Sequence, residues 1–239
     1  LSLMLNSNGE GSHECHFFGE REFKNSASMD GQTLQDLIDL ARRSMRVACY
    51  GVDTGWSGQD YRYTGDRDWD RLEADLRRVA RKGYDLYDAI INRLAGGSPA
   101  AADLAGLMRT PGLIQVALTD SARLYLPAAM ISDHPLDTEA EEYSLCSAFR
   151  EAWEGVDSLD QCDCFAGACP SYGQDTVICP GGFWGYRHAL GMPLSVVGAP
   201  DVTPEIAYAN APEMAVCVWA GRDFTMRPTH EQRLQALAL

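Results

Sequence analysis

Residues 177 to 195, "VICPGGFWGYRHALGMPLS", carry more information about the fold than any other stretch of the chain. A short apolar run is followed by a cysteine, three glycines, two large aromatic residues and an Arg-His pair. We interpret residues 177–179 as a central strand of a parallel sheet, because such strands are short, apolar and covered on both faces. The loop after them would leave the carboxyl end of the sheet, where open α/β folds place ligands.

The loop itself has two interpretations. Phe183 and Trp184 can fold back as a hydrophobic plug over the edge of the sheet, with Arg187 and His188 entering the next turn. Alternatively, these four residues form a surface that contacts a ligand or a partner. Large aromatic side chains act mostly through burial, which favours the structural loop.

Residues 1–98 predict an N-terminal hairpin and helical module. Asn8-Gly9 supplies the turn of a β-hairpin. Thr33 and Asp36 form a capping pair for a first amphipathic helix, which is expected to end at Gly51. A second long helix follows an aspartate cap at position 66 or 68. Its polar face mixes arginines with acidic residues, which is typical of a solvated surface.

Residues 99–239 predict an α/β domain. After a small helix near "AADLAGLM", short apolar runs bounded by Pro, Gly and Asp alternate with helical segments. These runs are residues 112–118, 123–127, 175–179 and 214–219. We therefore expect a mostly parallel sheet flanked by helices, preceded by the hairpin and the helical module.

Composition and charge narrow the range of partners. The formal net charge is −14, and such a surface does not favour nucleic acid or anionic lipid, whose phosphates are held by clustered Lys and Arg. No apolar run approaches the roughly 20 residues that cross a bilayer, and residues 1–10 lack the basic region of a signal peptide. We expect a cytoplasmic protein with no direct nucleic-acid or membrane partner.

The two ends of the chain suggest a longer protein. The first residue is Leu1 rather than Met, and the last twelve residues, "PTHEQRLQALAL", resemble a helix that has only begun. We therefore expect further polypeptide beyond this sequence.

Five of the eight cysteines lie between residues 146 and 179. Four thiolates from two loops would suit tetrahedral zinc, which stabilises irregular backbone that lacks its own core. The usual C-x2-C pairs are absent, so free thiols remain an alternative, and disulfides are a third in a compartment that is not reducing. The preferred structural zinc ligands are Cys146, Cys164, Cys169 and Cys179.

The sequence offers no catalytic pair. A cysteine nucleophile needs a nearby histidine, and the nine positions between Cys179 and His188 fix no geometry across a loop. Motifs of phosphate loops, dinucleotide folds, zinc peptidases and serine hydrolases are absent. We therefore assign no catalytic residue within this chain.

Several of these stretches resemble bacterial CHAT-type peptidases, which are caspase-like cysteine peptidases related to separase. The matching features are Leu126-Pro127, the turn His134-Pro135-Leu136-Asp137 and the run "CPGGFWGYRH" at 179–188. The resemblance covers about residues 110–239. It implies a caspase-like sheet, protein or peptide substrates, and a regulated role in defence or cell death.

The chain lacks the motifs that carry the catalytic residues in this family. Caspase-like peptidases use a His-Gly at one strand end and, further on, a cysteine in an Ala-Cys turn. None of the five histidines here precedes glycine. Cys49 in "VACYG" comes before the peptidase-like region, so we reject it as the nucleophile.

The resemblance therefore implies the front, non-catalytic portion of a peptidase. The His/Cys dyad would lie beyond Leu239 or on a partner chain, so that the remainder of the peptidase domain is itself a partner. The alternative is a pseudo-peptidase scaffold or binding module, zinc-stabilised in one version, that recognises a protein through the aromatic loops at 51–65 and 180–188.

Overall fold

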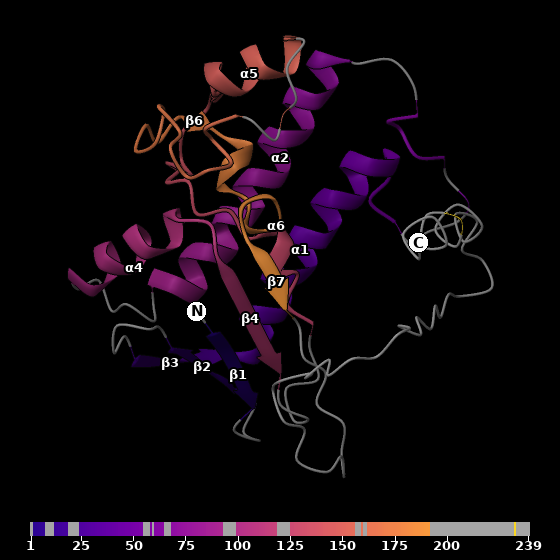
Figure 1. Cartoon of the computed structure of the whole chain (residues 1–239). Helices are drawn as coiled ribbons and strands as arrows, with labels where there is room; N and C mark the ends of the chain where they lie inside the picture. The colour runs from indigo at the N-terminus through magenta and orange to yellow at the C-terminus, as the bar shows by residue number, and fades with distance from the viewer. Residues whose placement is uncertain are drawn as a thin grey trace. The chain divides into compact units, whose positions relative to one another are not determined.

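A computed structural model describes most of the first 191 residues. The described residues are 2–7, 12–18, 24–54, 58, 60–64, 68–92, 99–118, 125–155, 159, 162–191 and 232. Except for residue 232, they all lie in the unit formed by Leu1–Val197, shown in Figure 1. The domain boundary expected between residues 98 and 99 borders on residues 93–98, which are outside the described part, and it stays a prediction.

The described residues contain a five-stranded mixed sheet with the strand order β3-β2-β1-β4-β7. Its strands are β1 (Ser2–Ser7), β2 (Ser12–Phe18), β3 (Lys24–Asp30), β4 (Leu113–Leu118) and β7 (Ala189–Gly191). The pairs β1–β2 and β2–β3 are antiparallel, whereas β4 is parallel to both β1 and β7. The predicted hairpin is confirmed. It joins the sheet through β1, which makes the sheet mixed rather than mostly parallel.

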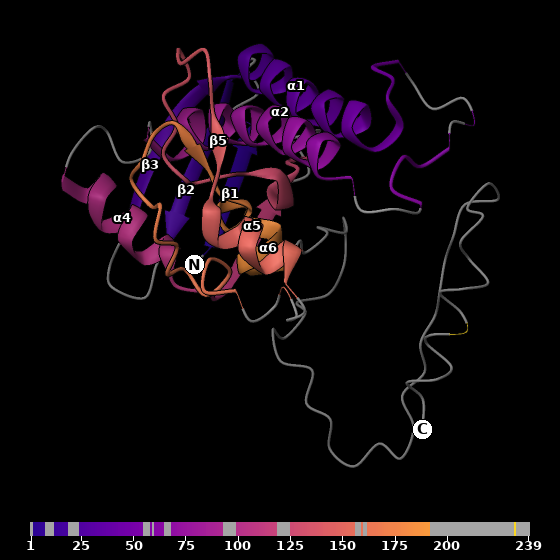
Figure 2. The same cartoon turned by 90° about the horizontal axis from the view of Figure 1, so that it is seen from above.

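Besides the strands, the described residues contain helices and shorter helical turns (Figures 1 and 2). They are α1 (Gly31–Tyr50), α2 (Trp69–Tyr87), α4 (Pro99–Arg109), α5 (Ser147–Glu154) and α6 (Trp184–Arg187), with the turns η1 (Asp88–Asn92), η2 (Ala128–Met130) and η4 (Pro180–Gly182). Both views show α1 and α2 side by side. The small helix predicted before the α/β region corresponds to α4.

The ends of α1 follow from its sequence. The carboxylate of Asp30 accepts hydrogen bonds from the backbone N–H of Thr33 at 2.7 Å and from its hydroxyl at 2.9 Å. Asp30 is therefore the N-cap, and the prediction of a Thr33–Asp36 cap was wrong by one turn, because Asp36 instead accepts from the side chain of Gln32. The predicted end at Gly51 is confirmed by its φ of 73°.

The second helix begins at a predicted cap and runs past an internal glycine. Asp68 accepts a hydrogen bond from the backbone N–H of Arg71 at 3.0 Å, which confirms one of the two expected caps. Gly83 lies inside α2, and a Cβ at this position would stand 2.2 Å from the carbonyl oxygen of Met130. The glycine allows η2 to pack directly on the helix backbone.

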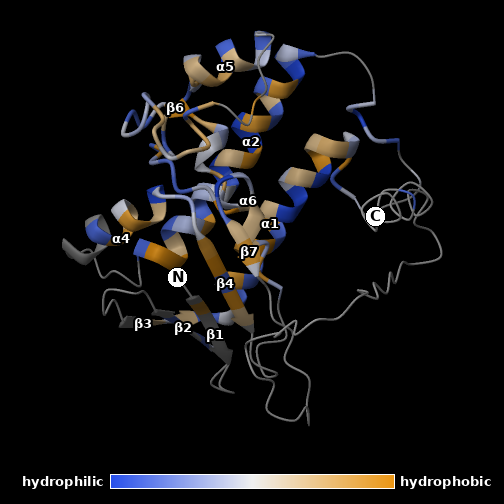
Figure 3. Ribbon diagram, in the orientation of Figure 1, coloured by the Kyte–Doolittle hydropathy of each residue, from blue (hydrophilic) through white to orange (hydrophobic). Residues whose placement is uncertain are grey.

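The main core lies between α1, α2, α4 and the sheet. Its fully buried side chains include Leu3, Leu34, Ile38, Leu86, Ile90, Leu104, Met108 and Val116. Figure 3 shows apolar residues along β4, in the middle of this layer. This half of the fold therefore holds itself together by burial of regular elements.

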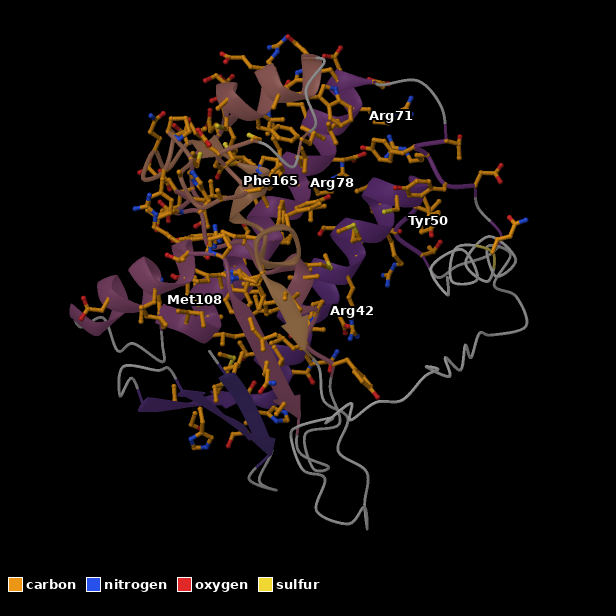
Figure 4. All side chains as sticks on the ribbon, in the orientation of Figure 1. Arg42, Tyr50, Arg71, Arg78, Met108 and Phe165 are labelled. Carbon is orange, nitrogen blue, oxygen red and sulfur yellow. The ribbon has the colours of Figure 1, made fainter. Side chains whose placement is uncertain are left out.

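Residues 125–188 are built differently, from short elements joined by turns. Here β5 (Ser144–Leu145) and β6 (Val177–Ile178) form a separate two-stranded parallel sheet among the described residues. A second, smaller core gathers around Phe149 and three of the cysteines. Phe165, labelled in Figure 4, packs at its edge against Phe149 and Tyr186.

The placement of residues 177–179 corrects the central expectation from the sequence. They are not a central strand of the large sheet, because β6 has two residues and pairs with β5. Pro180 ends the strand directly after Cys179. The interior parallel strand is β4, as expected for residues 112–118. Residues 125–127 are irregular, while 123–124 and 214–219 lie outside the described part.

Candidate metal centre

Four cysteine sulfurs meet in the second core. The Sγ atoms of Cys146, Cys164, Cys169 and Cys179 all lie within 4.8 Å of one another. Three of these residues are buried; Cys169 is half-buried as a residue, although its sulfur belongs to the same cluster. These are the four residues that the sequence nominated as zinc ligands.

The backbone brings two of the cysteines together through the small sheet. Cys146 directly follows β5 and Cys179 directly follows β6, so both leave the carboxyl ends of paired parallel strands. The N–H of Cys146 donates to the carbonyl oxygen of Ile178 at 2.9 Å, which fixes this register. Two short strands are therefore enough to place two sulfurs side by side.

The other two cysteines come from one tight turn. The N–H of Gly167 donates to the carbonyl oxygen of Cys164, and Gly167 has a φ of 84°. Glycine adopts this left-handed conformation without strain. A Cβ at Gly181 would lie 2.3 Å from the carbonyl oxygen of Cys164, so the turn also packs directly on η4. The chain closes on itself around the sulfurs.

The sulfur separations match a tetrahedral metal site. The Sγ atom of Cys146 lies 3.8 Å from that of Cys164 and 3.6 Å from that of Cys169. A Zn–S bond of about 2.3 Å gives a tetrahedral S···S edge of about 3.8 Å. A disulfide needs about 2.05 Å between sulfurs, and all four thiols are free. The arrangement therefore fits a cation better than a covalent bond.

The electrostatics of the cluster lead to the same conclusion. The thiol of Cys164 lowers the pKa of Cys146 to about 5, and the thiol of Cys146 lowers the pKa of Cys169. The same contacts with Cys146 raise the pKa values of Cys164 and Cys179. Four adjacent buried thiols cannot all ionise together without a positive charge between them. A divalent cation would supply that charge and keep all four as thiolates.

A histidine and a tyrosine stand beside the cluster. Nε2 of His134 lies 4.0 Å from Sγ of Cys169. The ring of Tyr172 meets the imidazole edge-on at 5.5 Å between centroids, and the guanidinium of Arg109 lies 4.0 Å above the tyrosine ring. These contacts link the cysteine turn to the end of α4.

The pair formed by Cys169 and His134 does not have the setting of a catalytic dyad. His134 is 2% exposed, so a peptide carbonyl cannot reach its ring. The sulfur of Cys169 is surrounded by the three other sulfurs of the cluster. This arrangement is suited to holding a cation and does not present a nucleophile to a substrate.

The loop after Cys179 is a buried plug in this structure. Trp184 is 0% exposed and Phe183 is 4% exposed, and Arg187 and His188 are also buried. Arg187 forms an ion pair with Asp133, and it donates to the carbonyl oxygen of Gly181 at 2.7 Å. These contacts are those expected if the loop acts as a structural plug. A role of these four residues in partner binding stays a prediction.

The same contacts join the two motifs that resemble CHAT-type peptidases. Nε1 of Trp184 donates to the carboxylate of Asp133 at 3.3 Å, and its backbone N–H donates to the carbonyl oxygen of Ile131 at 2.9 Å. Ser132 and Phe183 form an isolated antiparallel bridge. The segment around the His-Pro-Leu-Asp turn and the "CPGGFWGYRH" run are therefore one packed unit.

Cys179 and His188 are not joined as a nucleophile and a base. Nε2 of His188 contacts Nε of Arg187 at 3.3 Å, whereas Cys179 turns into the sulfur cluster. Burial lowers the pKa of His188 to about 4. The ring is therefore neutral at ordinary pH and sits inside the plug.

Cys49 also lacks the environment of an activated thiol. Its Sγ lies 3.6 Å from the sulfur of Met45, in the last turns of α1. Burial, and then the charge of Asp75, raise its pKa. Both effects disfavour the thiolate, in agreement with the rejection of Cys49 as a nucleophile.

The two aromatic loops meet around an apolar pocket of about 430 Å³. Tyr61 and Tyr63 from the first loop and Phe183 and Tyr186 from the second line it, together with apolar residues of α1, α2 and η2. Tyr61 and Tyr186 are 48% and 66% exposed and form its rim. The hydroxyl of Tyr63 donates to the carboxylate of Asp75 at 2.7 Å.

The sequence did not indicate the contacts that three residues make in this region. Asp133 carries the buried ion pair, His134 contacts the cysteine cluster, and Asp75 holds the first aromatic loop. A buried arginine requires an acidic partner, and Asp133 stands immediately before the His134-Pro135-Leu136-Asp137 turn. That requirement becomes visible only once Arg187 is known to be buried.

None of the helices in the described part is both long and apolar enough to cross a membrane.

Comparisons with known proteins give one match. No family model matches the chain, and no solved structure matches it. Over its whole length, the chain is 35% identical to a curated protein of Vitiosangium sp. (strain GDMCC 1.1324) that is named a probable protease. The chain spans about a third, 32%, of the length of that relative. It is therefore similar throughout to one part of a protein with a protease name.

Proposed function

We propose that this chain is the front portion of a caspase-like, CHAT-type cysteine peptidase that acts on proteins in a regulated defence or cell-death system. The observation that carries the proposal is the full-length similarity to one third of a protein named a probable protease. The packing of the two CHAT-like motifs against each other supports it, since it gives both motifs one structural role. The His/Cys dyad would be supplied by polypeptide outside these residues.

A cysteine-directed probe on the longer gene product would test this assignment. The protein encoded by the complete reading frame would be incubated with a peptide-based probe that alkylates active-site cysteines, and the labelled residue would be mapped by mass spectrometry. We expect label on a cysteine outside residues 1–239 and no peptide cleavage by these residues alone. Labelling of Cys49 or Cys179, or proteolysis by the isolated chain, would contradict the assignment.

The cysteine cluster has a structural role in this proposal. A Zn²⁺ ion held by Cys146, Cys164, Cys169 and Cys179 would fasten the plug and the cysteine turn to each other. The S···S separations and the convergence of four sulfurs in one core support such an ion. Because all four positions would be filled by protein sulfur, no open position remains for a substrate.

Metal analysis of the purified chain would test the zinc site. We expect about one zinc per chain and a melting temperature that falls when a chelator is added. Cys162→Ser is a matched control, because Cys162 lies in the same turn but donates to the carbonyl oxygen of Ala148 instead of joining the cluster. It should keep the metal, whereas Cys164→Ser should lose it.

The apolar pocket favours a second candidate function, a non-catalytic module that binds a protein partner. The pocket is lined by the two loops that the sequence nominated for recognition, and tyrosines form its rim. Tyrosine is enriched where protein interfaces bury their centres. In this reading, the longer protein would lack both the His-Gly strand end and the Ala-Cys turn.

A photo-crosslinking amino acid at Tyr186 would separate the two functions. Tyr125 is the matched control, because it is 60% exposed but does not line the pocket. A binding module should give a crosslink to a partner from position 186 but not from 125, together with no probe labelling. A peptidase should give probe labelling.

A further inference from the structure

We propose that His134 is the outer-sphere hydrogen-bond donor of the metal centre, with its Nε2–H directed at the thiolate of Cys169. The inference rests on the proposed metal site and deepens it, since it names a residue that positions and stabilises one ligand. His134 would not itself bind the metal, because the four sulfurs already complete a tetrahedral set.

The first observation is the direction of the ring. Nε2 of His134 lies 4.0 Å from Sγ of Cys169, at the long end of contacts to sulfur. The same sulfur is a thiolate when a metal is bound, and a thiolate has no proton to donate. The bond can then exist only with Nε2–H as donor, and bonds to charged acceptors are shorter than neutral ones. We therefore expect the contact to shorten upon metal binding.

The second observation is that packing on two sides holds the histidine in place. Tyr172 packs edge-on against it at 5.5 Å, and Arg109 in turn holds the tyrosine ring. A Cβ at Gly182 would lie 2.8 Å from Cβ of His134, so the backbone of the plug stands against the histidine. A buried imidazole fixed in this way can act as an oriented donor. On its other side, Nδ1 is 3.4 Å from the carbonyl oxygen of Pro135, beyond the usual range for a good hydrogen bond.

The third observation concerns the charge of the site. Four thiolates around one divalent cation leave a net charge of about −2 in a mostly buried place. Side-chain donors that face the sulfurs in the described residues are Ser171, at 3.6 Å from Cys146, and His134. Cys169 is the least buried of the four residues, and its sulfur is the one that faces His134. A donor at this sulfur offsets part of the negative charge of the site.

Cobalt titration of the full chain would test the inference. Three variants would be compared with the wild type: His134→Phe, which keeps a ring against Tyr172; His134→Gln, which keeps an N–H donor; and His13→Phe, a histidine on β2 far from the cluster in the sequence. Each protein would be titrated with Co²⁺ and then competed with a chromophoric chelator. The energy of the thiolate-to-cobalt charge-transfer band gives a readout that stability alone does not move.

We expect His134→Phe to bind one Co²⁺ with a four-sulfur spectrum but with a 10- to 100-fold lower affinity, the range typical for loss of an outer-sphere partner. Its charge-transfer band should shift to lower energy, because the thiolate loses a hydrogen bond. His134→Gln should recover most of both effects, and His13→Phe should resemble the wild type.

The possible failures can be told apart. A wild-type chain that binds no cobalt would refute the proposed metal site itself. If the wild type binds Co²⁺ and His134→Phe has the same affinity and the same charge-transfer energy, the role of His134 is overturned while the metal site stands. Equal losses in the Phe and Gln variants would also overturn it, since they would point to packing. A three-sulfur, one-nitrogen spectrum in the wild type would make His134 a ligand and would likewise contradict the proposal.

Discussion

Two regions of the molecule are stabilised differently. One is the large sheet with α1, α2 and α4, and the other is the segment at 125–188. The first buries regular elements against each other, with Leu34 and Ile38 of α1 fully enclosed. The second has strands of two residues and a core around Phe149 and the cysteines. Two specific interactions hold its backbone in place. They are the cluster of cysteine sulfurs and the buried ion pair of Asp133 and Arg187. The segment at 125–188 also contributes Ile131, Phe183 and Trp184 to the main core, so it adds polar chemistry to packing, whereas the first region depends on packing alone.

The largest effect should come from removing the metal. Cys164→Ser should unfold the segment at 143–188 locally while α1 and α2 stay folded, because metal binding contributes on the order of 10 kcal/mol in small zinc domains. Hydrogen exchange followed by mass spectrometry would show this as lost protection in one region only. Cys162→Ser should leave the exchange pattern unchanged. A uniform loss of protection in Cys164→Ser would show that the two halves are not separable.

Breaking the buried ion pair should have the next largest effect. Asp133→Asn leaves the guanidinium of Arg187 buried and unpaired, and such a loss costs about 3–5 kcal/mol. The double variant Asp133→Leu with Arg187→Met should be less destabilised than either single variant, since no charge remains buried. Urea unfolding at neutral pH would measure all of these changes.

An exposed ion pair offers the matched control for that cycle. Arg150 and Glu154 pair at 2.9 Å on α5 with side chains that are 55% and 56% exposed. Glu154→Gln should therefore cost less than about 1 kcal/mol. If Asp133→Asn cost no more than Glu154→Gln, the ion pair would not be a fastening of the plug.

Two glycines with the same backbone conformation isolate the effect of close packing. Gly167 has a φ of 84° and Gly173 a φ of 89°, so alanine strains both about equally. A Cβ at Gly167 would stand 1.9 Å from the carbonyl oxygen of Arg109, whereas a Cβ at Gly173 meets nothing within 4 Å.

Gly167→Ala should therefore be less stable than Gly173→Ala by about 1–3 kcal/mol, the usual cost of overpacking. It should also weaken metal binding, because the cysteine turn rests on α4 at this point. Thermal melts with and without chelator would check both. Equal melting temperatures for Gly167→Ala and Gly173→Ala would mean that the backbone of the turn shifts to accommodate the added methyl group at little cost.

The smallest expected effect concerns pH. Burial lowers the pKa of His188 to about 4, below the ordinary value near 6.5. Between these values, the unfolded chain binds a proton on this ring that the folded protein does not, so stability falls as the pH is lowered. From pH 6 to pH 5 the loss should be about 1 kcal/mol.

His188→Gln should flatten this part of the profile. The comparison with the wild type would be made by urea unfolding at equal metal loading, because thiolates also gain protons on acidification. Identical slopes for the two proteins would show that His188 does not titrate as a buried base.

The regular half of the fold could be predicted from the sequence because its signals are local. The Asn-Gly turn gave the hairpin, the apolar repeats gave α1 and α2, and Gly51 and Asp68 marked helix ends. The cysteine quartet was also found, since thiolates from separate loops suggest one centre even when their spacing is unusual. The helix and turn signals depend only on neighbouring residues, and the metal site is suggested by how many cysteines lie between residues 146 and 179.

The rest depends on contacts that no local pattern encodes. Residues 177–179 resemble a buried strand, but a two-residue strand beside a sulfur cluster has the same apolar composition. The partner of Arg187 lies more than 50 positions earlier in the chain, at Asp133. The cap of α1 is a local exception, since Asp30 replaces the expected cap at Thr33 by accepting from both donors of Thr33, three residues away.

The parallel pairing of β1 with β4 sets an order for synthesis on the ribosome. Ser2 stands opposite Gln115, so the partner of β1 is made about 110 residues later. At the usual 5–20 residues per second, the open side of the hairpin would wait roughly 5–20 seconds for it. An uncovered strand edge is a template for pairing between nascent chains. Neighbouring ribosomes on one message would therefore be the place where this protein is most exposed to misassembly, and where a chaperone would have the most to protect.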